Sequence, residues 1–292
     1  MLNQDLVDDL ARQKVVLFLG AGVSSSAPTR AGRRMMGWAA FLKAACRDMD
    51  AAQSDEIAAL IDSKDYLLAC EILQSFHADN WPGLIVAEYG QSAEPSELHR
   101  ALISLDQRIV LTTNFDKLIE AAWENKLGSS SHFPIVVAGI PDRAFSALKD
   151  YSRKYVIKIH GSTDDAENVV FSRSQYIKSA FANPLYSEFL DSLLLNYTFL
   201  FVGFSMDDPA ITSLMESYSF KYSRSRSHYI FVGNETPERF SEINRRLRKL
   251  VSIRYDTSDD HKELPGLINQ LARLMVTRRN EIFTDMRVAT AL

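Results

Sequence analysis

The chain has 292 residues, of which 46% are hydrophobic, and a formal net charge of −4. This size favours one large α/β domain, or one domain with a smaller lobe, and the charge excludes a generally polycationic surface for nucleic acid. The two cysteines, Cys46 and Cys70, cannot form a four-cysteine zinc site within the chain. Because no stretch resembles a signal peptide or a membrane span, we expect a cytoplasmic protein without membrane or direct nucleic-acid partners.

Short apolar runs recur along the chain. Residues 3–13 have the spacing of a short helix, and the run KVVLFL that follows predicts a strand buried on both faces, because it shows no alternation. Similar runs predict six more strands, at 108–112, 134–138, 155–160, 198–203, 228–233 and 251–255. Helical patterns at 116–127 and 237–250 separate some of them. This alternation predicts a Rossmann-like, doubly wound, mostly parallel sheet of the α/β class.

Residues 38–105 interrupt the rhythm, because they are rich in Ala and Leu and carry no strand pattern. We therefore expect a helical insert lobe beside the sheet of a single domain that spans residues 1–292. Residues 265–292 predict one long C-terminal helix. That helix could pack on the core, on a second copy of the chain or on a partner protein.

The first predicted strand runs directly into the motif GAGVSSS. Gly20 and Gly22 permit a tight turn and a close approach of the backbone to a ligand. The backbone amides from Ala21 onward could cradle a pyrophosphate, and the hydroxyls of Ser24 and Ser25 could add hydrogen bonds. Such turns also occur for packing reasons alone. The acidic residue that ordinary dinucleotide sites carry about 20 positions later is missing, so a standard dehydrogenase site is excluded.

Two further strand ends carry groups suited to catalysis. The motif TTNFD places Asn114 and Asp116 at the carboxyl end of the second predicted strand, where ligands of open α/β sheets bind. Asp116 could simply cap the following helix, whereas Asn114 precedes the cap and has no such role. The motif KIHGS places His160 at another strand end. There a histidine can act as a general base near neutral pH, or it can be a hydrogen-bonded structural residue.

Two later strands end in the same manner. The motif FVGFSMDD ends a strand in Gly203 and Ser205, with acidic residues behind them, and FVGNE ends another in Asn234. Because the carboxyl ends of parallel strands meet at one edge of a sheet, polar residues at five such ends point to one shared pocket.

Taken in order, GAGxS, TxNxD, HG, GxS and a late strand ending in Asn resemble the sirtuin (SIR2) domain, and more narrowly the SIR2-like NAD-cleaving domains of bacterial antiphage defence systems. The resemblance covers roughly residues 10–256. It implies that Asn114 holds the nicotinamide ribose and water, that His160 is the base, and that Asp116 helps to bind the nicotinamide side. It also implies a set of residues for the rest of the dinucleotide: Gly20, Ala21, Gly22, Ser24, Ser25, Thr113, Gly203, Ser205 and Asn234.

Departures from the deacetylase sirtuins narrow the expected chemistry. The segment after Gly161 has no cysteine, so the sirtuin zinc module is missing, as it is from the defence domains. The resemblance thus implies an NAD+ hydrolase (an NAD+ glycohydrolase) with NAD+ as substrate and no metal, which releases nicotinamide and ADP-ribose and depletes NAD+ in antiphage defence. An NAD-dependent protein deacylase and a non-catalytic NAD or ADP-ribose sensor are the alternatives.

An enzyme that destroys cytoplasmic NAD+ would kill its host unless it were controlled. We therefore expect control by self-assembly, a homo-oligomer, or by a separate sensor or ATPase protein. The helical insert at 38–105 and the C-terminal helix are the candidate contact surfaces.

Overall fold

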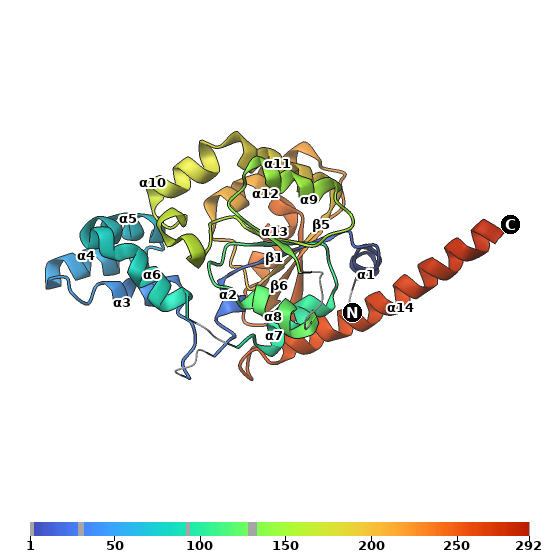
Figure 1. Cartoon of the computed structure of the whole chain (residues 1–292), viewed down its shortest axis with the longest axis horizontal. Helices are drawn as coiled ribbons and strands as arrows, with labels where there is room; N and C mark the ends of the chain where they lie inside the picture. The colour runs from blue at the N-terminus through green and yellow to red at the C-terminus, as the bar shows by residue number, and fades with distance from the viewer. Residues whose placement is uncertain (1–2, 29–31, 92–93, 128–132, 292) are drawn as a thin grey trace.

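The computed structural model describes residues 3–28, 32–91, 94–127 and 133–291, and the ends of the predicted single domain, residues 1, 2 and 292, lie outside these ranges. The strands form one seven-stranded sheet in the order β3-β4-β2-β1-β5-β6-β7, and helices surround it (Figure 1). Every neighbouring pair is parallel. The predicted α/β, doubly wound fold is confirmed.

All seven predicted strands are present. They are β1 (Val15–Leu19), β2 (Ile109–Thr112), β3 (Ile135–Ala138), β4 (Tyr155–Lys158), β5 (Thr198–Val202), β6 (His228–Gly233) and β7 (Leu250–Tyr255). The central strands β1, β2, β4 and β5 are buried along their whole length. Their unbroken apolar runs therefore reflect burial on both faces of the sheet.

Helices connect the strands. They are α1 (Gln4–Ala11), α2 (Ala21–Ser24), α3 (Trp38–Ala45), α4 (Ala51–Asp62), α5 (Tyr66–His77), α6 (Trp81–Tyr89), α7 (Glu97–Ser104), α8 (Leu118–Leu127), α9 (Ser146–Lys149), α10 (Arg173–Tyr176), α11 (Pro184–Asn196), α12 (Pro209–Lys221), α13 (Glu238–Arg248) and α14 (Glu263–Ala291). Four short helical segments complete the set: η1 (Ala78–Asn80), η2 (Asp142–Phe145), η3 (Thr163–Asn168) and η4 (Ile177–Phe181).

Two helical layers cover the sheet. Phe18 and Phe201 point to one face, where they pack with α9, α11 and α12. Leu17 and Leu200, their chain neighbours, point to the other face and pack with α1, α7, α8 and α14. The alternation follows from the two-residue period of a strand, which turns successive side chains to opposite sides.

The insert between β1 and β2 forms a lobe beside the sheet, seen at the left of Figure 1. Helices α3 to α6 share a core of their own, which Phe115 and Phe171 from the sheet domain complete. Phe171 lies within 6.4 Å, between ring centroids, of five aromatic rings of this core. Helix α7, at the end of the predicted insert 38–105, packs on the sheet instead, through Leu98 and Leu102.

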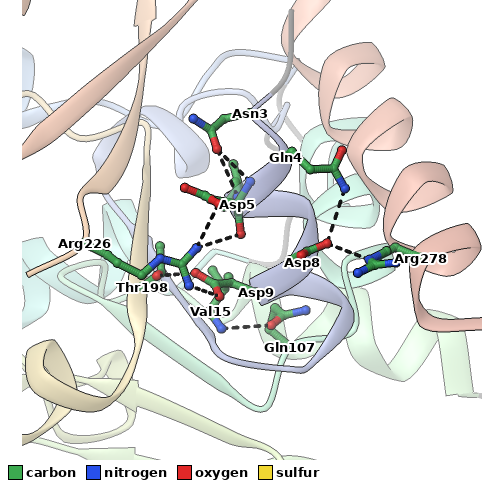
Figure 2. A network of polar contacts seen from close by, with 11 residues as sticks. Asn3, Gln4, Asp5, Asp8, Asp9, Val15, Gln107, Thr198, Arg226 and Arg278 are labelled. Atoms are coloured by element: carbon green, nitrogen blue, oxygen red, sulfur yellow. Dashed lines mark hydrogen bonds and ion pairs between the residues drawn. The ribbon is translucent and has the colours of Figure 1, made fainter. Parts of the chain in front are cut away.

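Helix α14 begins on the sheet and then leaves it. Leu264, Ile268 and Leu271 are buried, whereas the last turns project away from the domain (Figure 1). Its middle is tied to α1, because Arg278 donates a 2.7 Å hydrogen bond to Asp8 (Figure 2). Over the described ranges, no helix combines the length and the apolar character that crossing a membrane requires.

A polar network fixes helix α1 to the edge of the sheet at which the strands begin (Figure 2). Asp9 accepts a 2.6 Å hydrogen bond from the Thr198 hydroxyl at the start of β5 and a 2.8 Å bond from Arg226 before β6. Gln107 accepts a hydrogen bond from the Val15 amide. These contacts lie at the amino ends of the strands, at the edge of the sheet opposite to the predicted ligand site.

Candidate active site

The loops after β1 and β5 touch through their backbones. Gly22 donates a 2.9 Å hydrogen bond to the Gly203 carbonyl. A Cβ atom on Gly20 would lie 2.3 Å from that carbonyl oxygen, and one on Gly22 would lie 2.9 Å from the Gly203 Cα. Gly203 itself has φ of +62°, which favours glycine. Packing of two loops therefore requires all three glycines, at the point where the strand order reverses.

A cavity of about 870 Å³ opens beside this contact. Ligands of doubly wound sheets bind at such reversal points, outside the carboxyl ends of the strands. The lining residues come from the connections that follow β1, β2, β4, β5 and β6, and from α5, α10 and β7. Among them are Ala21, Gly22, Trp38, Lys64, Asp65, Tyr66, Thr113, His160, Arg173, Tyr176, Gly203, Ser205, Asp207, Asp208, Gly233 and Tyr255. The wall is thus shared by the sheet and the helical lobe.

A second, small cavity of about 20 Å³ adjoins the first. Ser24, Asn114 and Asp116 line it. Ala21, Trp38 and Thr113 line both cavities, so the two spaces share a wall. Of the predicted site residues, Gly20, Ser25 and Asn234 line neither.

Asn114, Ser24 and Asp116 form one hydrogen-bonded chain. The Asn114 Nδ2 atom donates to Gly20 O at 2.9 Å and to Ser24 Oγ at 2.7 Å. Ser24 donates in turn to Asp116 Oδ2 at 2.5 Å. Asp116 also accepts the Leu118 amide at the start of α8, as the helix-capping alternative for Asp116 requires. No described residue donates to Asn114 Oδ1, so this oxygen is available to a ligand or to water.

His160 follows β4, and Asn114 follows β2, the strand that pairs with β4. Thr112 of β2 pairs with Lys158 of β4, and each candidate catalytic residue follows that pair by two positions. His160 is 2% exposed and lines the large cavity. Neither of its ring nitrogens has a hydrogen-bond partner among the described residues. Burial lowers the pKa of His160, and the Asp208 carboxylate, 3.5 Å from Nε2, opposes that shift.

Residues 108–255, just over half of the chain, match the family model described as SIR2-like domain. The chain belongs to the SIR2-like family. The matched region contains Asn114, Asp116, His160, Gly203, Ser205 and Asn234, whereas the glycine loop after β1 lies before it.

Several curated relatives are similar to this SIR2-like chain. An NAD(+) hydrolase ThsA from Cytobacillus dafuensis is 26% identical over 250 residues, which is 84% of this chain and 44% of the relative. An NAD(+) hydrolase ThsA from Bacillus cereus (strain MSX-D12) is 24% identical over 237 residues, 80% of this chain and 46% of the relative. A defense-associated sirtuin 2 from Bacillus subtilis is 22% identical over 217 residues, 73% of this chain and 20% of the relative. The SIR2-like chain thus spans less than half the length of these three relatives.

The structure adds two site residues that sequence patterns did not single out. Asp208 is the N-cap of α12, and its Oδ1 accepts the Ile211 amide and the Tyr176 hydroxyl. Tyr176 packs edge-on against the His160 ring, with 5.6 Å between centroids. The acidic pair after GFS was a signal for Asp208, whereas nothing in the local sequence marks Tyr176.

The helical lobe contributes a wall that sequence reasoning also missed. Trp38 and Tyr66 face the cavity and lie 6.1 Å apart between ring centroids. Arg173 pairs with Asp65 at 2.8 Å across the same wall. An Ala/Leu-rich block gives no hint of which of its aromatic residues faces a ligand and which faces the lobe core.

Two predicted ligand contacts have other partners. The Ser25 hydroxyl donates to the Gly22 carbonyl at 3.2 Å, and its side chain is half-buried. Asn234 is exposed and donates to Asp256 at 3.1 Å, while its neighbour Gly233 lines the large cavity. Their roles toward a dinucleotide stay predictions.

Across the described residues, no group of three or more His, Cys, Asp or Glu side chains is placed to hold a metal ion. Cys46 and Cys70 are free thiols, and burial raises the pKa of both. Both cysteines belong to the core of the helical lobe rather than to the cavity. Besides His160, Asn114 and the carboxylates, the cavity lining offers hydroxyl groups, such as that of Ser205, and the cations Lys64 and Arg173.

Proposed function

We propose that this SIR2-like chain is an NAD+ hydrolase that breaks the nicotinamide–ribose bond and releases nicotinamide and ADP-ribose. The observation that carries the proposal is the cavity at the reversal point, which joins the Gly22–Gly203 contact to His160. Two relatives named NAD(+) hydrolase ThsA support it. A volume of about 870 Å³ lies in the range of cofactor sites, roughly 300–1,000 Å³.

The dinucleotide would lie along the carboxyl edge of the sheet. Its phosphates would approach the backbone at Ala21, Gly22 and Gly203, where a Cβ atom has no room. The adenosine would reach toward Gly233 and Tyr255, at the far end of the lining. The nicotinamide ribose would then face His160 and the shared wall with the small cavity of Asn114.

Bond cleavage expels nicotinamide as a neutral molecule, because the ring was cationic before the bond broke, and it leaves positive charge at ribose C1′. A water molecule then forms the new C–O bond and loses a proton. His160 would accept that proton, or one from a ribose hydroxyl, a contribution of roughly 10²–10⁴ in rate. Asn114 would orient the water or the ribose through its free Oδ1, because its amide protons are already engaged.

The biological role we propose is that of an effector of bacterial antiphage defence, which acts in the cytoplasm by NAD+ depletion. A relative named defense-associated sirtuin 2 supports this role. Control would come from a homo-oligomer or from a separate sensor or ATPase protein, with the helical insert and the projecting part of α14 as contact surfaces. Activity that falls on dilution, or that requires an added partner, supports control of this kind, and full activity as a dilute monomer contradicts it.

Mass spectrometry of NAD+ after incubation with the protein tests the function. The hydrolase forms nicotinamide and ADP-ribose without any peptide, and the His160→Ala variant serves as the control. A deacylase would form O-acetyl-ADP-ribose, and only when an acetyl-lysine peptide is present. Binding of NAD+ without release of nicotinamide, at high protein concentration and with candidate partners, would instead indicate a sensor.

A further inference from the structure

One carboxylate oxygen of Asp208 faces the imidazole ring of His160. Its Oδ1 is occupied, because it accepts the Ile211 amide at 3.0 Å and the Tyr176 hydroxyl. Its Oδ2 accepts no hydrogen bond from a described residue and lies 3.5 Å from His160 Nε2. The Asp208 side chain is only 11% exposed. A carboxylate oxygen and an imidazole nitrogen thus face each other in a nearly water-free place, slightly beyond hydrogen-bond distance.

We propose that Asp208 is a positioning residue for His160: it fixes the imidazole proton on Nε2 and stabilises the imidazolium that forms when His160 acts as a base. The catalytic role of Asp208 rests on the proposed function. The interaction between the Asp208 carboxylate and the His160 imidazole rests on the geometry alone. With the proton on Nε2, the Nδ1 lone pair is the base. The proton lost by water or a ribose hydroxyl goes to Nδ1 and not to Asp208.

Other groups around His160 do not supply this charge. Tyr176 presents its ring edge, and its hydroxyl is engaged with Asp208 and with the Ala210 amide. Burial raises the pKa of the Tyr186 hydroxyl on α11, so that this group stays neutral. Lys158, two residues before His160 on β4, is bound to Asp116 O and Glu120 instead.

The remaining charges of the cavity wall are paired with one another. Arg173 binds Asp65 at 2.8 Å, and Lys64 lies 4.0 Å from Asp207. Opposite charges within about 4–6 Å favour the ionised form of a group. Asp208 is therefore the charge that counteracts the desolvation of His160.

The variant Asp208→Asn removes the charge and keeps the fold. Asparagine caps a helix as well as aspartate does, so α12 retains its cap. We expect the pKa of His160, followed by NMR titration of its ring signals, to fall, because the Asp208 charge no longer opposes desolvation of the imidazole. We expect kcat for nicotinamide release to fall roughly 10–100-fold, by analogy with the loss of a partner that orients a metal-bound histidine, with little change in KM.

The matched control is Asp50→Asn, at the exposed N-cap of α4, where Asp50 accepts the Gln53 amide. It makes the same substitution in the same structural role and should change neither the His160 pKa nor kcat. If Asp208→Asn does not fold, Asp208→Ser removes the charge and still offers a capping oxygen. The His160→Gln variant identifies the His160 signal among those of the six histidines.

The two readouts separate this inference from the proposed function. A lowered His160 pKa in Asp208→Asn supports the positioning role even if the parent protein releases no nicotinamide, and in that case the hydrolase proposal fails alone. An unchanged or raised His160 pKa overturns the positioning role. A kcat for nicotinamide release equal to that of the parent protein, in an Asp208→Asn variant that is active, also overturns the positioning role.

Discussion

Asn114 donates a 2.7 Å hydrogen bond to the hydroxyl of Ser24 and thereby joins the loop after β2 to the loop after β1. Ser24 passes the connection on to Asp116, and Asn114 also binds the Gly20 carbonyl. Both amide protons of Asn114 are therefore engaged before any ligand arrives. The amide plane is fixed, and its Oδ1 is the group left to contact water or a ribose.

The Ser24→Ala variant removes the link in this chain. It leaves the Asn114 amide and Asp116 Oδ2 each without one partner in a buried place, so we expect the free energy of unfolding to fall by about 1–3 kcal/mol. Urea unfolding measures it. Ser25→Ala is the matched control, because the half-buried Ser25 side chain bonds only to the carbonyl of Gly22, three residues before it, and we expect a smaller loss of stability than for Ser24→Ala. Equal stability of the two variants would contradict the role of Ser24.

The Gly203→Ala variant tests the loop contact. A Cβ atom there would lie 2.5 Å from the Val23 amide nitrogen, and the residue has φ of +62°. We expect a loss of roughly 1–3 kcal/mol in the free energy of unfolding, since both backbones must move. Gly37→Ala is the control, because a Cβ atom there meets nothing within 4 Å. A Gly203→Ala protein as stable as the parent would refute the close packing.

His228 makes stability depend on pH. Burial, and secondarily Lys249, lowers the pKa of His228 to about 3. Between pH 6.5 and pH 3 the imidazole of His228 is protonated in the unfolded chain but stays neutral in the folded protein. The free energy of unfolding therefore falls as the pH falls from 6.5 toward 3. Between pH 7 and pH 5 the loss is about 2 kcal/mol, and His99, with its pKa lowered to about 4, adds to it. Urea unfolding at the two pH values should show a smaller difference for His228→Gln, and an unchanged difference would disprove the assignment.

The strands could be predicted because burial on both faces leaves a plain record, an unbroken apolar run such as that of Val15–Leu19. The placement of Asn114 and His160 at the same edge of the sheet followed from the strand-end rule, and the register of Thr112 with Lys158 gives that placement a structural basis. Contacts between loops leave no such record. Whether Ser24 faces a phosphate or Asn114 depends on the register of β1 against β2, and the reach of Tyr176 to Asp208 depends on the path of the chain between β4 and β5.

Replacing His160 by alanine should abolish activity at little cost in stability. Neither ring nitrogen of His160 has a hydrogen-bond partner among the described residues and the ring lines the large cavity, so the variant breaks no hydrogen bond. We expect kcat for nicotinamide release to fall roughly 10²–10⁴-fold, with a melting temperature close to that of the parent. Asn114→Ala should lose activity too, but also stability, because it breaks the bonds to Gly20 and Ser24. Parent-like release by either variant would refute its catalytic role.

The most direct measurement is a crystal structure of the inactive His160→Ala protein with intact NAD+. The account predicts that the phosphates lie against Gly22 and Gly203 and that the nicotinamide ribose lies between Asn114 and position 160, with Asn114 Oδ1 toward the sugar or its water. A dinucleotide bound elsewhere, or one whose ribose lies beyond the reach of Asn114, would contradict it.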